Sequence, residues 1–135
     1  MPTPEQLIEL MPFAATVGIV VAQADPTEVR GRLEFSPERC TAGGILHGGA
    51  LMALADSLGG VCAFLNLPDG AQTATMTSNT SFVRGARGDV SAVARPLHVG
   101  RTVIIVQTDI HDGDDRLVAQ VTQTQAVLSQ QKGPR

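Results

Sequence analysis

The stretch 47–66 constrains the fold of this chain more than any other part of the sequence. It opens with His47 and two glycines and then runs almost uninterrupted through apolar residues, long enough for about five helical turns. A helix that is apolar on all sides is a buried helix, and an acid inside it needs a partner, a bound proton or a chemical role. Asp56 is that acid. We therefore expect one buried central helix with the rest of the chain arranged around it.

Length and composition limit the chain to one ordinary domain and exclude several functions. The 135 residues predict a single domain over 1–135, with a helix and lead-in over 1–13 and a frayed tail over 129–135. A net charge of −3 and the absence of Trp and Tyr argue against a nucleic-acid partner. Cys40 and Cys62 show neither the spacing of a zinc site nor that of a disulfide framework, so no metal is expected.

The sequence contains no segment typical of a secretory signal or of a good membrane span. Its first residues, MPTPEQLIELMP, lack the basic start and apolar run of a signal peptide. The central stretch carries Asp56 and several glycines and is too short and broken to cross a bilayer well. The expected protein is soluble and cytoplasmic, without a membrane partner.

Residue periodicity predicts a helix, two strands, the central helix and four further strands. Thr3 caps the first helix, which Pro12 is expected to end. The other expected elements are strands over 16–24 and 28–35, a loop over 36–46, and strands over 73–83, 89–98, 102–111 and 116–128. Tight turns between strands predict a largely antiparallel sheet, and hence an α+β fold in which the sheet wraps the central helix.

The last strands are predicted to contribute little to a second core layer, because their Thr- and Gln-rich faces are polar. Within 116–128, one face is expected to carry Val118, Gln120, Thr122, Thr124 and Ala126. Because the chain has only one long apolar helix, part of the cover of that helix is expected from another subunit.

Four stretches carry a resemblance to a known family: 44–49 (GILHGG), 54–57 (LADS), 78–84 (SNTSFVR) and 94–102 (ARPLHVGRT). They resemble the hotdog-fold acyl-CoA thioesterases of the phenylacetate-degradation type, which are related to the hydroxybenzoyl-CoA thioesterases. The resemblance spans roughly 14–128 and implies a curved antiparallel sheet wrapped around one long central helix. It also implies hydrolysis of an acyl-CoA thioester with an aromatic or medium-chain acyl group, without a cofactor beyond the coenzyme A of the substrate.

Thioester hydrolysis needs a group that stabilises the oxyanion and a base or nucleophile near the carbonyl. The resemblance places the Gly48 amide, at a helix N-terminus, on the thioester oxygen, with His47 orienting that turn or contacting the thioester. It implies Asp56 as general base or nucleophile, and the residues do not decide between the two. Thr75 falls where some relatives carry a hydroxyl near the carboxylate and is expected to position water.

His47 and Asp56 are too far apart to serve one carbonyl from a single chain. They are nine residues apart, which is about 13 Å along a helix axis. In the resembling enzymes the helices of two subunits lie antiparallel, and a site combines Gly48 of one chain with Asp56 of the other. The resemblance therefore implies a homodimer, and a dimer of such dimers.

The resemblance also implies a set of substrate-binding residues. Arginine has forked donors that suit phosphate oxygens, so arginines at strand ends are assigned to the phosphates and adenosine of coenzyme A. Asn79 and Ser81 are expected to share one strand face with Thr75 and Thr77 and to orient the substrate. The complete set is Gly49, Asn79, Ser81, Arg84, Arg87, Arg101 and Thr102.

Some positions depart from the family pattern. Relatives often carry Asn or Gln six residues before the histidine, where this chain has Thr41. The hydroxybenzoyl-CoA relatives carry Glu in place of Asp56 and Thr in place of Gly60. The aspartate therefore fits the phenylacetate branch better, and Gly60 leaves space for an acyl ring or chain.

Plainer interpretations remain open at this point. Asp56 can be a buried acid in a salt bridge with an arginine, Thr75 a simple strand residue, and the arginines solvated loop charges. Gly59 and Gly60 can allow close packing of the helix on the sheet. The alternative functions are a non-catalytic hotdog protein that binds acyl-CoA, and a hotdog hydratase or dehydratase, which usually needs a His paired with an acid in a different motif.

Overall fold

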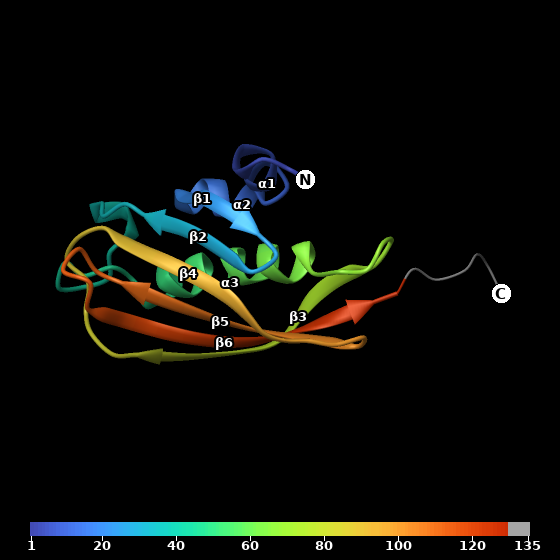
Figure 1. The fold of residues 1–135 in the computed structure, drawn as a ribbon. Helices are drawn as coiled ribbons and strands as arrows, with labels where there is room; N and C mark the ends of the chain where they lie inside the picture. The colour runs from blue at the N-terminus through green and yellow to red at the C-terminus, as the bar shows by residue number, and fades with distance from the viewer. Residues whose placement is uncertain (130–135) are drawn as a thin grey trace.

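One antiparallel sheet and one long helix make up most of the structure, a computed structural model in which residues 1–129 are described (Figure 1). The six strands follow the order β1-β2-β4-β5-β6-β3, and all neighbouring pairs are antiparallel. The strands are β1 (Ile19–Asp25), β2 (Glu28–Leu33), β3 (Gln72–Phe82), β4 (Val90–Val99), β5 (Val103–His111) and β6 (Leu117–Leu128). The helices are α1 (Pro4–Glu9), α2 (Pro12–Val17) and α3 (Gly48–Leu65), with a short 3-10 turn at Pro37–Arg39. The expected α+β class is confirmed.

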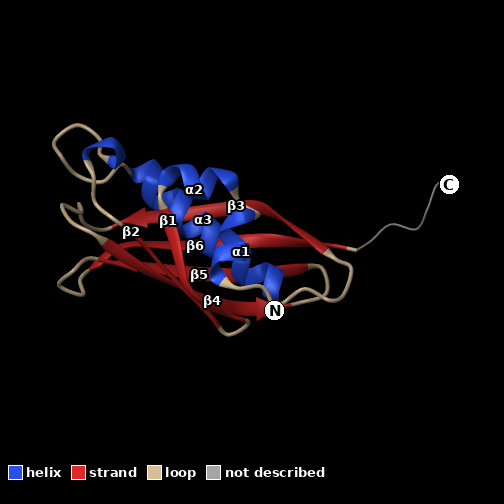
Figure 2. Cartoon of the chain, turned by 90° about the horizontal axis from the view of Figure 1, so that it is seen from above, coloured by secondary structure: helices blue, strands red, loops and turns tan. Residues whose placement is uncertain are grey.

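The sheet curves around α3, which lies along its concave face (Figure 1 and Figure 2). The helix residues that pack into the core are Leu51, Leu54, Ala55, Leu58, Gly59, Val61, Cys62 and Ala63. By length and composition α3 is apolar enough to cross a membrane, but in this fold it is the helix around which the core is built.

The opposite face of α3 is left partly uncovered by its own chain. Met52, Asp56 and Phe64 are exposed on this open face. They are four and eight residues apart, so they form one stripe along the helix. Residues 1–129 therefore bury only one side of α3, although the helix is apolar almost all round.

The N-terminal region forms two helices where the sequence predicted one helix and the start of a strand. Thr3 and Gln6 form the expected capping box: Thr3 N donates to Gln6 Oε1 (2.8 Å) and Gln6 N donates to Thr3 Oγ1 (3.2 Å). Pro12 was expected to end a helix but begins α2, because a proline at the first helical position loses no intrahelical hydrogen bond. Gly18, with a φ of 94°, then ends α2, so β1 starts at Ile19, later than predicted.

The two edges of the sheet are β1 and β3. β1 is partly covered by α1 and α2, which pack against it. β3 is 11 residues long, and most of its side chains are exposed. Within the described chain, β3 therefore presents a row of unpaired backbone groups along its outer edge. The tail predicted over 129–135 lies, beyond Ser129, outside the described residues.

A bulge in β3 changes which side chains share a face of that strand. The pairing with β6 shifts by one residue directly after Thr75. Since strand side chains alternate, one extra residue moves the later side chains to the opposite face. Thr75 faces α3, whereas Asn79 and Ser81 pair with Thr122 and Gln120 on the outer face of the sheet. The prediction that Asn79 and Ser81 share a face with Thr75 is therefore wrong.

The inner face of β6 is half apolar and half polar. Val121 is followed on this face by Gln123 and Gln125, and both glutamines are no more than 1% exposed. On the outer face of this strand Gln120 and Thr122 are exposed, in line with the prediction that its polar faces contribute little to a second core layer. On the inner face Gln123 and Gln125 are buried, so polar side chains enter the core that packs on α3, which the sequence did not lead us to expect.

Gly59 allows α3 to lie directly against Gln123 of β6. A Cβ on Gly59 would overlap the side-chain amide of Gln123, whereas a Cβ on Gly60 would meet nothing within 4 Å. The packing role considered for the glycine pair is therefore confirmed at Gly59, where the absence of a Cβ permits the close approach.

Replacing Gly59 by alanine is expected to lower the free energy of unfolding by about 1–3 kcal/mol, because the methyl group overpacks space filled by Gln123. Gly60→Ala is the matched control: it adds the same group next to open space and should be neutral or raise this free energy by up to ~1 kcal/mol. Urea unfolding of both variants measures the difference. Equal stabilities would show that Gly59 has room for a side chain.

Burial raises the pKa of the Cys62 thiol to about 11, and the negative charge of Asp25 acts in the same direction. Since the thiolate is the reactive form, Cys62 should stay unlabelled by iodoacetamide in the folded protein at pH 8, while the half-buried Cys40 reacts. In urea both thiols should react. Mass spectrometry counts the labels, and Cys62→Ala assigns them. Labelling of Cys62 as fast as Cys40 in the folded protein would contradict this burial.

Candidate active site

The N-terminus of α3 is held by its own first residues. His47 Nδ1 accepts a hydrogen bond from the Gly49 amide (2.7 Å), so His47 caps the helix. His47 N donates in turn to Arg39 O (2.8 Å), which anchors the same backbone turn. Within residues 1–129 the Gly48 amide donates to no other group. One N–H at the positive end of the helix dipole is therefore free to bind a ligand oxygen.

Gly48 borders a cavity of about 350 Å³ between the loop before α3 and the end of β3. Its lining includes Thr41, Leu51, Phe82 and Arg84. The Phe82 ring lies beside Gly48, where an added Cβ would sit 3.2 Å from it. A side chain at this position would crowd the Phe82 ring, so the close approach of the ring to the backbone favours glycine here.

Asp56 lies near the middle of α3, on the open face of the helix. Its Oδ1 accepts two hydrogen bonds, one from Thr75 Oγ1 on β3 (3.1 Å) and one from Gln123 Nε2 on β6 (3.2 Å). Within residues 1–129, Asp56 forms no ion pair and Oδ2 accepts no hydrogen bond. The described chain thus gives no support to a salt bridge at Asp56, and one carboxylate oxygen remains available for chemistry.

A cavity of about 280 Å³ lies beside Asp56. Its lining comes from α2 and the residue before it, from α3, and from strands β3 and β6: Met11, Phe13, Ala14, Asp56, Ser57, Gly60, Thr73, Ala74, Thr75 and Gln125. Asp56 is the one ionisable group among these lining residues. The lining combines apolar residues with polar groups that converge around Asp56, as in small-molecule sites.

Gly48 and Asp56 face different cavities of the same chain. They are eight residues apart in one continuous helix, or about 12 Å along its axis. A third cavity, of about 650 Å³, lies beside His47 and Gly49, and Phe13 borders both this cavity and the one at Asp56. A single described chain therefore does not bring the amide and the carboxylate to one substrate atom.

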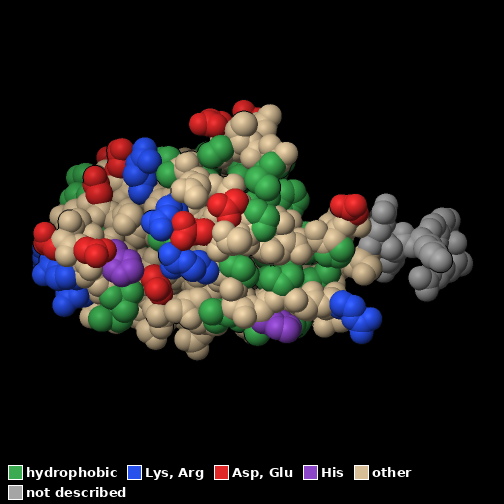
Figure 3. Space-filling view, in the orientation of Figure 1, with side chains coloured by type: hydrophobic (Ala, Val, Ile, Leu, Met, Phe, Trp, Pro, Cys, Tyr) green, Lys and Arg blue, Asp and Glu red, His purple; other side chains and the backbone are tan. Residues whose placement is uncertain are grey.

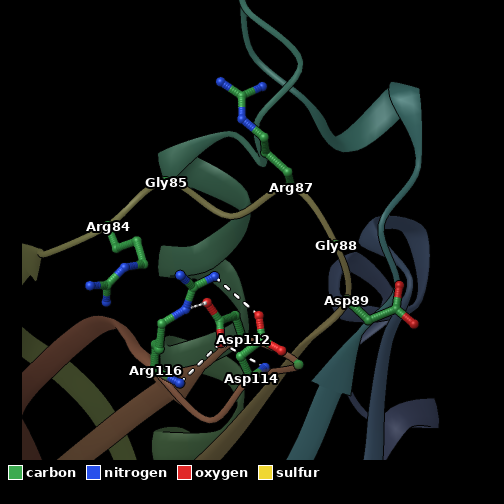
Figure 4. A pocket seen from close by; sticks show the side chains of 9 residues that line it. Arg84, Gly85, Arg87, Gly88, Asp89, Asp112, Asp114 and Arg116 are labelled. Atoms are coloured by element: carbon green, nitrogen blue, oxygen red, sulfur yellow. Dashed lines mark hydrogen bonds and ion pairs between the residues drawn. The ribbon is translucent and has the colours of Figure 1, made fainter.

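Side chains of both charge signs are intermixed at the end of the sheet where β3 leads into β4 and β5 turns into β6 (Figure 3). A cavity of about 680 Å³ at this end is lined by three arginines, three aspartates and three glycines: Arg84, Arg87, Arg116, Asp89, Asp112, Asp114, Gly85, Gly88 and Gly113 (Figure 4). The mixture of signs means that only some of these arginines can offer a free positive charge.

Arg116 is already neutralised in this cavity. Its guanidinium pairs with Asp112 (2.9 Å) and with Asp114 (3.3 Å), as the dashed lines of Figure 4 show. Hydrogen bonds from the backbone N–H groups of Arg116 and Asp114 hold the pKa of Asp112 below its usual value. Asp112 therefore stays ionised at neutral pH and keeps Arg116 paired.

Arg84 and Arg87 make no such pairs. Arg84 donates to Leu117 O (3.3 Å) and Arg87 donates to Gly43 O (2.8 Å). Neither pairs with a carboxylate within residues 1–129, and Arg87 points away from the Asp112–Arg116 group (Figure 4). These two arginines are the positive charges that an anionic ligand could use at this end of the sheet.

Arg101 and Thr102 lie at the opposite end of the sheet, in the turn between β4 and β5. Thr102 O there accepts a hydrogen bond from Val127 N of β6 (2.9 Å). The predicted substrate-binding residues are therefore spread over both ends and, with Asn79 and Ser81, over the outer face. The structure does not bring them together in one protomer.

Gln123 and Gln125 are the residues at this site that sequence reasoning missed. Gln123 contacts Asp56, and Gln125 Nε2 donates to Thr75 Oγ1 (2.7 Å). The available signal was their spacing, because both continue the buried face of Val121 at intervals of two residues. A glutamine on an apolar face must find a polar partner, and the acid of the central helix was a candidate.

Comparisons with known sequences identify the family. The sequence profile of the thioesterase superfamily matches residues 43–119, more than half of the chain. A Mycobacterium tuberculosis protein named as a candidate esterase is 31% identical over 121 residues, which cover 87% of this chain and 86% of that protein. The 1,4-dihydroxy-2-naphthoyl-CoA hydrolase of Escherichia coli is 37% identical over 86 residues, which cover 63% of each chain.

Solved structures have the same architecture. A thioesterase of Pseudomonas aeruginosa, crystallised as a Gln→Ala variant, superimposes with a TM-score of 0.88 at 27% identity and covers 95% of both chains. A thioesterase of Haemophilus influenzae superimposes with a TM-score of 0.91 at 24% identity, covering 100% of this chain and 96% of that one. The hotdog fold expected from the four motifs is confirmed, and the chain belongs to the thioesterase superfamily.

Proposed function

We propose that this protein hydrolyses an acyl-CoA thioester to a free acid and coenzyme A, with water as the second substrate and no further cofactor. The observation that carries the proposal is the environment of Asp56. One carboxylate oxygen is held by Thr75 and Gln123, and the other has no partner within residues 1–129. Membership of the thioesterase superfamily supports the proposal, and the Escherichia coli relative is named as the hydrolase of a CoA thioester.

Two chemical routes use this carboxylate. As a general base, Asp56 Oδ2 takes a proton from water while the water oxygen attacks the thioester carbon. The oxyanion that forms accepts a hydrogen bond from a Gly48 N–H. The C–S bond then breaks as the carbonyl re-forms, and the leaving thiolate takes the proton from Asp56. As a nucleophile, Oδ2 attacks the carbon itself, the CoA thiolate leaves and takes a proton from solvent, and water hydrolyses the resulting anhydride.

Each site in this proposal combines Gly48 of one chain with Asp56 of a second copy. The separation of about 12 Å along α3 makes one chain insufficient for both roles. The stripe of Met52, Asp56 and Phe64 and the exposed edge of β3 are the surfaces on which a second copy would pack. We propose a homodimer as the catalytic unit, with two such dimers in the assembly.

The acyl group in this proposal occupies the cavity beside Asp56. Its volume of about 280 Å³ and its lining by Met11, Phe13 and Gly60 suit a single aromatic ring or a medium chain. Arg84 and Arg87, which pair with no carboxylate within residues 1–129, are the candidates for the phosphates of coenzyme A.

A hydratase or dehydratase is less well supported by this site. Such chemistry needs a histidine paired with an acid. His47 Nδ1 accepts the Gly49 amide in the helix cap, so an acid that paired with the Nε2–H would leave the ring without a nitrogen to act as a base. A non-catalytic acyl-CoA-binding protein is the remaining alternative, and enzymatic assay separates it from the proposal.

Asp56→Asn keeps the shape of the side chain and one accepting oxygen but removes the base. We expect release of the CoA thiol to fall by at least about 100-fold in Asp56→Asn and in Asp56→Ala. The measurement is colorimetric thiol release over a panel of aromatic, short-chain, medium-chain and long-chain acyl-CoA thioesters. Asp69→Asn changes an exposed carboxylate in the turn after α3 and should keep the activity.

Two outcomes of this assay would count against the proposal in different ways. A wild-type protein that releases thiol from no member of the panel would refute thioesterase activity on this class of substrate and favour a binding role. Full activity in Asp56→Asn would retain hydrolysis but refute the assignment of Asp56.

Gly48→Pro removes the proposed oxyanion donor with little change to the helix. Proline suits the first helical position, and His47 before it already has the extended backbone that precedes proline, with ψ of 134°. We expect at least about a 100-fold loss of activity. Gly48→Ala is the matched control, since it adds a Cβ beside Phe82 but keeps the N–H, and should lose much less.

Mixed dimers test whether two chains share each site. A Gly48→Pro chain paired with an Asp56→Asn chain has one site with both groups intact and one with neither. Random pairing of equal amounts should restore about a quarter of the wild-type activity, since half of the dimers are mixed and each has one working site. Activity no higher than that of the separate variants would mean that the two groups act within one chain.

A further inference from the structure

A chain of side-chain hydrogen bonds runs across β3 and β6 and ends on Asp56. Thr73 Oγ1 lies 3.0 Å from Gln125 Oε1, and Gln125 Nε2 lies 2.7 Å from Thr75 Oγ1. Thr75 Oγ1 lies 3.1 Å from Asp56 Oδ1. A second amide, Gln123 Nε2, reaches the same carboxylate oxygen at 3.2 Å. Asp56 is the one ionisable member of this network.

Each hydrogen bond of this network is donated in the direction of the carboxylate. A threonine hydroxyl has a single proton, and an ionised carboxylate only accepts hydrogen bonds. Because Gln125 donates through Nε2 to Thr75, the Thr75 proton is free to be donated to Asp56 Oδ1. The other end of the amide, Gln125 Oε1, then accepts the proton of Thr73.

The reverse orientation of the Gln125 amide would reverse the hydrogen bond between Gln125 and Thr75, so that Thr75 no longer donates to Asp56. Thr75 would then donate its proton to Gln125 Oε1. Thr75 Oγ1 and Asp56 Oδ1 would lie 3.1 Å apart with no proton between them, which is repulsive when Asp56 is ionised. The ionised carboxylate therefore selects the amide orientation, and that orientation in turn fixes the Thr75 proton.

Burial and strand pairing hold the Gln125 side chain in place beside Thr75. Its side chain is 1% exposed, and it pairs directly with Thr75 in the β3–β6 register. Thr73 Oγ1 also lies 2.9 Å from Ala126 O, so its single proton is shared between this carbonyl and Gln125 Oε1. Thr75 itself is exposed, so without Gln125 its hydroxyl would be free to rotate and to bond water instead.

We propose that Gln125 is a positioning residue for Asp56. By donating to Thr75, it directs the Thr75 proton onto Oδ1 and leaves Oδ2 as the oxygen that takes a proton from water or attacks the thioester carbon. Gln123 acts on the same oxygen from the neighbouring inward position of β6. The inference rests on the proposed thioesterase activity, since it assigns a role within that reaction.

Gln125→Met tests this role, because methionine has nearly the shape of glutamine without its amide. We expect kcat to fall about tenfold, the effect of losing one hydrogen bond that orients a charged group, with KM almost unchanged. The control is Gln120→Met, which makes the same change on the outer face of the same strand and should leave both constants unaltered.

A double-mutant cycle separates positioning through Thr75 from a general structural effect. Thr75→Val removes the hydroxyl at nearly constant volume and should itself lower kcat about tenfold or more. Adding Gln125→Met to Thr75→Val should then cause less than about a twofold further loss, because the path to Asp56 is already broken. The proposal would be overturned if the kcat loss of the double variant were the product of the two single losses, or if kcat were unchanged in Gln125→Met.

NMR spectroscopy provides a readout that does not depend on activity. The side-chain amide signals of Gln125 should shift in Asp56→Asn, because the loss of the negative charge at position 56 changes the hydrogen bonds of Thr75 and thereby those of Gln125. The exposed Gln72 serves as the control. A Gln125 amide that does not respond would overturn the positioning role. An intact response in a protein that hydrolyses no thioester would overturn only the proposed reaction.

Discussion

The rest of the structure depends on the incomplete burial of α3. The helix is apolar around most of its circumference, yet the sheet of its own chain covers one side only. Leu54 and Leu58 lock the covered side into the core, which fixes the rotation of the helix and turns Asp56 to the open side. There the polar ends of Thr75 and Gln123 can reach the carboxylate from β3 and β6. The same packing thus stabilises the fold and sets the position of the acid.

Features encoded in short, local patterns could be predicted from the sequence. The capping box at Thr3, the central helix beginning after His47 and the four long strands after it all depend on residues close to one another in the chain. Together with four motifs they were enough to identify the family. Pro12 shows the limit of such patterns, because a proline suits both the residue after a helix and the first residue of one.

Features that depend on the pairing of distant segments could not be predicted. The bulge after Thr75 appears only when β3 is aligned with β6, and it reverses the faces of Asn79 and Ser81. The contact between Gln125 and Thr75 likewise depends on the pairing of β6 with β3, so no residue near Gln125 in the sequence indicates it. Gly48, Asp56 and Thr75 could be named as candidate positions from the sequence, but the hydrogen bonds that support Asp56 required the fold.

The place of α2 bears on how such a chain can change during evolution. Through Phe13, α2 forms part of the wall of two cavities, one beside Asp56 and one beside His47. It contributes none of the side chains that hydrogen-bond to Asp56, and Gly18 separates it from the first strand. Mutations in α2 can therefore reshape the space available to a ligand while the polar groups on α3, β3 and β6 keep their partners. Substitutions in α2 can thus change which ligand fits the cavities, while α3, β3 and β6 continue to hold the carboxylate in place.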